Sequence, residues 1–148
     1  MAHINYLDRY FKRPYFISIR EKFNEKIFKK IRNKVIRQFN SPIRKKFCGA
    51  VISNNYTTDF FRIKFVKELN KYKPLDFGGK VYNNVGYVKD KIKFLNSYKF
   101  SIAMENTEGD GYLSEKIFQS FLSGTIPIYY GDYLLDEYIN LKSLILIG

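Results

Sequence analysis

The segment "KFSIAMENTEGDGYLSEKIFQSFLSGTIPIYYG", residues 99–131, determines the expected fold class. Its two ends, "KFSIAM" and "TIPIYYG", are short apolar runs of the kind that form buried strands. Between them, Ile117, Phe118, Phe121 and Leu122 recur at helical spacing and predict one apolar stripe. Two strands joined by a helix form a βαβ unit, in which the strands lie parallel in one sheet.

The same alternation of strand and helix patterns continues on both sides of this segment. Strands are predicted at residues 47–53 ("FCGAVIS") and 143–148 ("SLILIG"). Helices are predicted at residues 59–72, 88–98 and 133–139, the last of them brief. Because no helix follows the last strand, we expect one face of the sheet to be poorly covered and the chain to be a piece of a larger protein.

A second kind of pattern occupies residues 19–39, "IREKFNEKIFKKIRNKVIRQF". Apolar residues recur every four positions and basic residues fill the other faces, which predicts an amphipathic helix that "NSP" at residues 40–42 ends. Three interpretations stay open: a solvated helix packed on the rest of the protein, a basic helix lying on an anionic membrane, or a nucleic-acid-binding helix.

The composition limits the classes of function. Twenty-six basic residues against fourteen acidic ones give a net charge of +12, which favours an anionic partner such as nucleic acid, a membrane surface or a phosphorylated substrate. No apolar run reaches the length of about 18 residues that spans a membrane, and no signal-peptide pattern opens the chain. The single cysteine, Cys48, excludes an internal disulfide, and the single histidine, His3, argues against a histidine-centred triad or zinc site.

The loop before the central helix carries the candidate ligand site. Ser114 is a plausible N-cap, so Glu115 and Lys116 occupy the first helical positions. A lysine there opposes the helix dipole unless an anion such as phosphate binds beside it. The glycines of "EGDG" let the backbone approach a ligand, and the loop follows a strand end, where parallel sheets bind ligands. The alternative is an ordinary strand-to-helix connection with both charges solvated.

Two other kinds of site find little support in this loop. It contains neither a G-x-x-x-x-G-K-[ST] phosphate loop nor a G-x-G-x-x-G dinucleotide fingerprint. Glu108 and Asp110 of "EGD" offer two carboxylates, which is weak support for a metal site, so we expect no essential metal.

The segment "ENTEGDGYLSEKIFQSFLSGTIPIYYG" resembles the donor-binding signature of glycosyltransferase family 10, the α-1,3-fucosyltransferases, especially bacterial members. Three further segments resemble the same family: "SNNYTTDFFRIKFVKEL", "DFGGKVYNNVGYVKDKIKFLNSYKFSIAMEN" and "DRYFKRPYF". Residues 19–46 match least well. Ser114 stands where the family has threonine, and the loop before Arg62 is longer than expected and lacks the family's proline.

The resemblance implies an α/β fold, a Rossmann-like parallel sheet that forms the donor-binding half of a GT-B glycosyltransferase, here incomplete and truncated at both ends. Residues 1–40 would be the end of the acceptor domain and a basic helical linker, and residues 41–148 a partial GDP-fucose-binding domain. The implied reaction is inverting transfer of fucose from GDP-fucose to a sugar hydroxyl, at O3 of N-acetylglucosamine in a glycan or lipopolysaccharide.

The resemblance also implies roles for individual residues in donor binding. Arg62 and Lys116 would neutralise the diphosphate, whose negative charge grows as GDP departs. Glu105 could orient the loop through backbone hydrogen bonds.

The remaining donor-binding residues would contact the nucleoside and the sugar. Glu115 would accept hydrogen bonds from the ribose hydroxyls. Asn106 and Tyr112 would line the nucleotide-sugar pocket, and Ser53 and Asn54 would lie at its floor.

No catalytic residue is expected in this chain, because the general base of such enzymes belongs to the N-terminal acceptor domain. We therefore expect the chain alone to bind GDP-fucose weakly or not at all and to catalyse little, with no cofactor. The expected partners are GDP-fucose, a glycan acceptor and an anionic membrane surface, but not nucleic acid. The expected location is cytoplasmic, with peripheral attachment at the inner face of a bacterial membrane. The alternative is a non-catalytic basic α/β module that binds anionic membranes or glycolipids.

Overall fold

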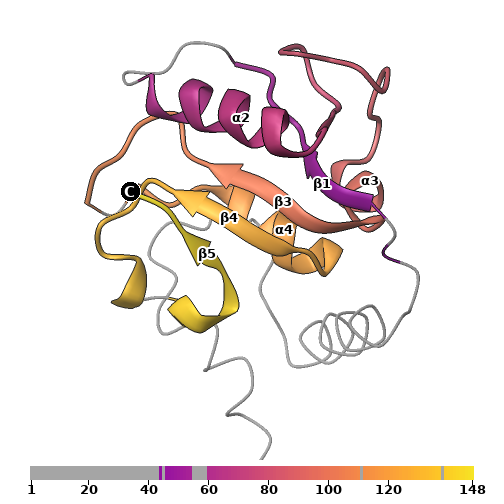
Figure 1. Ribbon diagram of the computed structural model, residues 1–148. Helices are drawn as coiled ribbons and strands as arrows, with labels where there is room; N and C mark the ends of the chain where they lie inside the picture. Colours follow the sequence, from indigo (N-terminus) through magenta and orange to yellow (C-terminus); the bar gives the residue numbers. More distant parts are fainter. Residues whose placement is uncertain (1–43, 45, 55–59, 111, 138) are drawn as a thin grey trace, which may run out of the picture.

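The computed structural model describes residues 44, 46–54, 60–110, 112–137 and 139–148 (Figure 1). The basic helix predicted at residues 19–39, and with it the proposed unit 1–40, lies outside the described residues. None of the described helices is long and apolar enough to cross a bilayer.

Five parallel strands form one sheet in the order β2-β1-β3-β4-β5. Their bounds are Lys46–Ala50 for β1, Asp76–Phe77 for β2, Tyr98–Met104 for β3, Ile126–Tyr130 for β4 and Ile145–Leu146 for β5. The pairing of β3 with β4 runs from Phe100 opposite Ile126 to Met104 opposite Tyr130. The predicted parallel α/β sheet is therefore confirmed.

The helices lie between the strands. Their bounds are Phe61–Tyr72 for α2, Lys91–Leu95 for α3 and Glu115–Ser123 for α4, with short 3-10 helices at Leu135–Glu137 (η2) and Leu141–Ser143 (η3). The ends of α4 follow the prediction, because Ser114 caps the N-terminus and Gly124 ends the helix in the left-handed conformation, at φ 72°.

Three predicted elements are shorter than expected. The helix predicted at 88–98 is the five-residue α3, because the Asp90 side chain caps it by accepting from the Lys93 N–H and β3 already begins at Tyr98. The brief helix predicted at 133–139 is only the 3-10 turn η2, and the strand predicted at 143–148 is the two-residue β5.

Two apolar clusters cover the two faces of the sheet. On one face, alternate residues such as Ile102 and Ile128 pack with Val66 of α2. On the other face, Ala103 and Tyr129 pack with Ile117 of α4. Alternation of this kind follows from the period of two in a strand. Figure 1 shows α2 and α4 on opposite sides of the sheet.

The expectation of one poorly covered face is therefore wrong for the centre of the sheet. It holds only at one edge, where Ile145 and Leu146 of β5 are exposed.

Candidate functional site

The strand order places the switch point of the sheet at the carboxyl edge of β1 and β3. From β1 the chain passes through α2 to β2, which pairs with one edge of β1. From β3 it passes through α4 to β4, which lies in the opposite direction along the sheet. A crevice forms where connections from neighbouring strands diverge in this way, and open α/β sheets bind ligands there. The segments that follow β1 and β3 carry most of the residues predicted to bind the donor.

Arg62 joins the segments that follow β1 and β3 at this switch point. It lies in the first turn of α2 and is only 4% exposed. Its Nη1 donates to Asn106 Oδ1, after β3, at 2.5 Å. Its Nη2 donates to the carbonyl oxygen of Asn54, after β1, at 2.6 Å. Arg62 is therefore not an ordinary surface arginine, and it forms one cluster with two other predicted residues, Asn54 and Asn106, which we call the Arg62 cluster.

Glu105 organises the loop that leads into α4. Its side chain is fully buried, and its carboxylate accepts from the Ser114 N–H at 2.8 Å and from the Ser114 hydroxyl at 2.7 Å. The same carboxylate forms an ion pair with the Lys116 ammonium at 2.5 Å. The Glu105 N–H donates to the Tyr130 carbonyl oxygen at 2.8 Å, which ties the loop to β4. Glu105 thus anchors both the loop and the start of α4.

The anion that the sequence pattern required beside Lys116 is present within the chain, as Glu105. This contact does not close the lysine to ligands, because its side chain remains 21% exposed. An ammonium has three donors, and within the described part of the chain Lys116 donates to Glu105 and, at 3.4 Å, to the Ser114 hydroxyl. Lys116 is therefore held in a fixed position with one face toward solvent.

The other predicted donor-site residues are accessible. Glu115 is exposed in the first turn of α4, and Tyr112 is exposed in the loop before it. Ser53 and Asn54 are exposed beyond the end of β1. Asn54 enters the Arg62 cluster through its backbone carbonyl. Because Asn106 directly follows Glu105, the Arg62 cluster and the Glu105–Lys116 pair are adjacent in the chain.

Gly131, after β4, is a functional position that the sequence patterns did not indicate. A Cβ atom there would lie 2.5 Å from Glu105 Cγ, and the backbone has φ 152°. Only glycine permits this close approach. The buried position of Glu105 therefore depends on a glycine that is 26 residues away in the sequence.

Lys91 is a further basic residue that the sequence reasoning missed. It is half-buried at the start of α3, which packs against α4. Burial lowers the pKa of its ammonium, and the nearby charge of Lys116 also lowers it, while Glu115 and Glu105 act in the opposite direction. Lys91 therefore lies in the electrostatic environment of the Glu105–Lys116 pair. The segment "KDKIKFL" did not indicate this position, because Lys91 comes near Glu105 and Lys116 only through the packing of α3 on α4.

The described part of the chain contains no group of three or more histidine, cysteine, aspartate or glutamate side chains that could hold a metal ion. The charged groups of the candidate site are two fixed cations, Arg62 and Lys116, and the carboxylates of Glu105 and Glu115 near Lys116. The fold and this site together define a doubly wound α/β protein with a polar, cation-bearing site at the switch point of the sheet.

Comparison with known proteins identifies the family. Residues 41–147 match the model of the C-terminal region of glycosyltransferase family 10, the fucosyltransferases. The chain is 39% identical over 112 residues to an α-(1,3)-fucosyltransferase of Helicobacter pylori, covering 75% of this chain and 23% of that protein. It is 35% identical over 101 residues to an α-(1,3)-fucosyltransferase of Drosophila melanogaster, covering 59% and 23%. The chain belongs to glycosyltransferase family 10.

Solved structures agree with this assignment. An α1,3-fucosyltransferase with GDP-fucose gives a TM-score of 0.69 at 34% identity, covering 91% of this chain and 42% of that one. An α1,3-fucosyltransferase with GDP gives 0.70 at 33% identity, with the same coverage. The expected fold class, the Rossmann-like sheet of the GT-B fucosyltransferases, is thus confirmed. The chain spans about a quarter of the curated relatives and less than half of the solved chains.

Proposed function

We propose that this chain is the donor-binding part of a fucosyltransferase that transfers fucose from GDP-fucose, with inversion, to a sugar hydroxyl in a glycan or lipopolysaccharide. The observation that carries the proposal is the position of Arg62 and Lys116. Both cations lie in segments at the carboxyl edge of the sheet, where an α/β protein binds its ligand. The similarity to α1,3-fucosyltransferase structures with GDP-fucose and GDP supports the choice of donor.

The cations act on the leaving group. As the bond between fucose and phosphate breaks, negative charge grows on the diphosphate of GDP, and fixed positive charges stabilise that state most. Asn106 and the Asn54 carbonyl hold the Arg62 guanidinium before a ligand arrives, and Glu105 holds the Lys116 ammonium. Little reorganisation is then needed at the moment of reaction.

The exposed residues beside the cations bind the rest of the donor. Glu115 accepts hydrogen bonds from the ribose hydroxyls, since its carboxylate is exposed one position before Lys116. Tyr112, Asn106, Ser53 and Asn54 line the pocket for the nucleotide sugar. Two protein cations supply the positive charge in this mechanism, so donor binding is expected to be insensitive to a metal chelator.

The general base is proposed to come from an acceptor domain outside these residues. An inverting transfer requires a base within hydrogen-bond reach of the acceptor hydroxyl. The chain spans only 23% of its Helicobacter pylori relative, so most of the relative's length has no counterpart here. The part played by this chain is to hold the donor and to stabilise the departing GDP.

Calorimetric titration of GDP into the whole chain tests the proposal. We expect weak saturable binding that is lost in Lys116→Ala and in Arg62→Ala. The matched control is Lys142→Ala, which removes an exposed lysine of η3 at the far edge of the sheet. Unchanged binding in both site variants would refute the proposed site, whereas no binding by a wild-type chain with a folded circular-dichroism spectrum would show that the pocket needs segments beyond this chain.

A second candidate function follows from the net charge of +12. A non-catalytic basic module would bind anionic membranes or glycolipids through its surface charge. The same charge would also hold a transferase peripherally at the inner face of a bacterial membrane.

A further inference from the structure

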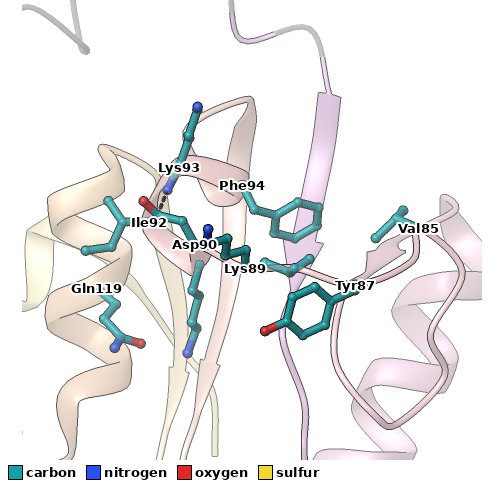
Figure 2. A pocket seen from close by; sticks show the side chains of 10 residues that line it. Val85, Tyr87, Lys89, Asp90, Ile92, Lys93, Phe94 and Gln119 are labelled. Atoms are coloured by element: carbon teal, nitrogen blue, oxygen red, sulfur yellow. Dashed lines mark hydrogen bonds between the residues drawn. The ribbon is translucent and has the colours of Figure 1, made fainter.

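An open groove of about 860 Å³ lies beside the candidate donor site, between α4 and the segment that leads into α3. Its lining combines apolar residues with basic, aromatic and amide side chains, among them Lys89, Lys91, Tyr87 and Gln119. It also contains one carboxylate, that of Asp90, which caps α3. Figure 2 shows the Tyr87 ring and the Gln119 amide on facing sides of the groove, while the Lys93 ammonium points away from Gln119. None of these residues belongs to the donor site described above.

Gln119 supplies an acceptor atom without a donor. Its Oε1 atom is buried and has no hydrogen-bond partner among the residues that the structure describes. A buried polar atom in this state costs about 1–3 kcal/mol, so such atoms usually have a partner in the functional state of a protein. A hydroxyl or an N–H group of a ligand in the groove would supply the missing donor.

Lys91 supplies a cation that no carboxylate of the described residues contacts directly, although Glu115 and Glu105 lie close enough to raise its pKa. No hydrogen bond or ion pair joins its ammonium to the described part of the chain, and burial depresses its pKa. An anion in the groove would offset the cost of burying the ammonium and favour its charged form. Lys89, which also lines the groove, adds a second positive charge at its exposed side.

Tyr87 supplies an accessible ring. It is 91% exposed, so one aromatic face is available for packing against a ligand. A ligand that suits all three features has a hydroxyl for Gln119, an anionic group for Lys91 and a ring face for Tyr87.

We propose that this groove binds an anionic sugar unit of the acceptor, one that bears a phosphate or a carboxylate. The inference rests on the proposed function for its ligand class, since a fucosyltransferase acts on saccharides. The position of the groove also fits, because Lys91 and Gln119 lie next to Glu115 and Lys116 on the packed helices α3 and α4. The groove would therefore select charged acceptors and present them near the donor.

The test is a nuclear magnetic resonance titration of the whole chain, read from the Gln119 side-chain amide. Four probes are compared: glucose 6-phosphate, glucuronate, glucose and inorganic phosphate. We expect saturable shifts with one or both anionic sugars, and the sugar that binds identifies the anionic group. Binding should weaken by about ten- to a hundredfold in Lys91→Met, which removes one charge-assisted contact and keeps the aliphatic stem.

Three further variants separate the groove from the donor site and from folding defects. Gln119→Glu places a carboxylate in the groove and should abolish binding of anionic sugars even if Lys91→Met is unstable; because it removes the side-chain amide, its titration is read from the backbone N–H of Lys91. Lys142→Met removes the same charge at the far edge of the sheet and should leave binding unchanged. Lys116→Ala should abolish GDP binding but not the sugar shifts, so the two proposals can fail independently.

Three outcomes would overturn the inference. Equal binding of glucose would show that the charge of the sugar is irrelevant. Equal binding of inorganic phosphate and glucose 6-phosphate would show that the groove recognises no saccharide. Absence of any shift in a chain that still binds GDP would show that the groove is not a ligand site.

Discussion

Single residues of the site are held in position by contacts that only the folded chain provides. Arg62 is buried and spans the ends of two strands, and Glu105 is buried with both a backbone N–H and an ammonium as partners. The sequence predicted which residue types gather at this edge, because their spacing follows the local strand-to-helix pattern. It could not predict that Glu105 pairs with Lys116 or that Arg62 is buried, since both depend on tertiary packing.

Glu105→Gln tests the role of the buried carboxylate. The amide oxygen can still accept from the Ser114 N–H, but the ion pair with Lys116 is lost. We expect the free energy of unfolding to fall by about 1–3 kcal/mol, as for loss of a hydrogen bond to a charged group. Urea denaturation at neutral pH measures the change. Glu108→Gln, an exposed carboxylate of the same loop, is the control and should have little effect.

At the scale of elements, local patterns predicted the long strands and helices and failed for the short ones. Helix α4 has both a periodic stripe and capping residues, so its bounds could be predicted to the residue. Strand β2 contains only Asp76 and Phe77, too few residues for any alternation, and it was missed. Its position is set instead by pairing with β1 and by contacts of Asp76 with the side chains of Lys46 in β1 and Tyr98 in β3.

Gly131→Ala tests the turn after β4. The new methyl group would collide with Glu105, which would have to leave its buried position. We expect destabilisation of about 1–3 kcal/mol, typical of an overpacked site, together with loss of GDP binding through displacement of Lys116. Thermal unfolding and calorimetry measure the two effects. Gly109→Ala is the matched control, because a Cβ there meets no atom within 4 Å.

The contacts that Asp76 of the edge strand β2 makes with Lys46 and Tyr98 should depend on pH. Burial alone would raise the pKa of this carboxyl, but hydrogen bonds from Lys46 and Tyr98 and the charge of Lys46 outweigh it and lower the pKa. Because the folded-state pKa lies below the unfolded value of about 4, the stabilisation is present above pH 4 and is lost as the pH falls through the folded-state pKa.

We therefore expect Asp76→Asn to be less stable than wild type at neutral pH by about 0.2–1 kcal/mol, as for a partly exposed pair. The difference should disappear under acid conditions. Denaturant titrations at a series of pH values from neutral to acid measure it. A constant difference across the series would contradict the ionic contribution, and Asp110→Asn, at an exposed position, provides the comparison.

At the scale of the whole molecule, the charge of +12 predicts attraction to anionic surfaces. We expect co-sedimentation with vesicles that contain an anionic lipid at low salt and release at high salt, because screening weakens surface attraction. Neutral vesicles are the control. Binding that resists high salt would instead indicate insertion of apolar side chains.

The fold class could be predicted from the sequence because alternating patterns and a family resemblance agreed over most of the chain. The coverage of the two faces of the sheet could not be predicted in the same way. The sequence predicted α2 and α4 as helices but did not indicate which face of the sheet each one covers.

The two cations of the site differ in how far along the chain their partners lie. Lys116 and Glu105 are 11 residues apart, whereas Arg62 and Asn106 are 44 residues apart. Contacts between distant residues require closure of longer loops, and parallel strand pairing makes such contacts slow to form. Lys116 can thus acquire its partner early in folding, and Arg62 only when β1 and β3 have paired. A ligand that needs both cations would bind only the completely folded chain and would serve as a reporter of complete folding.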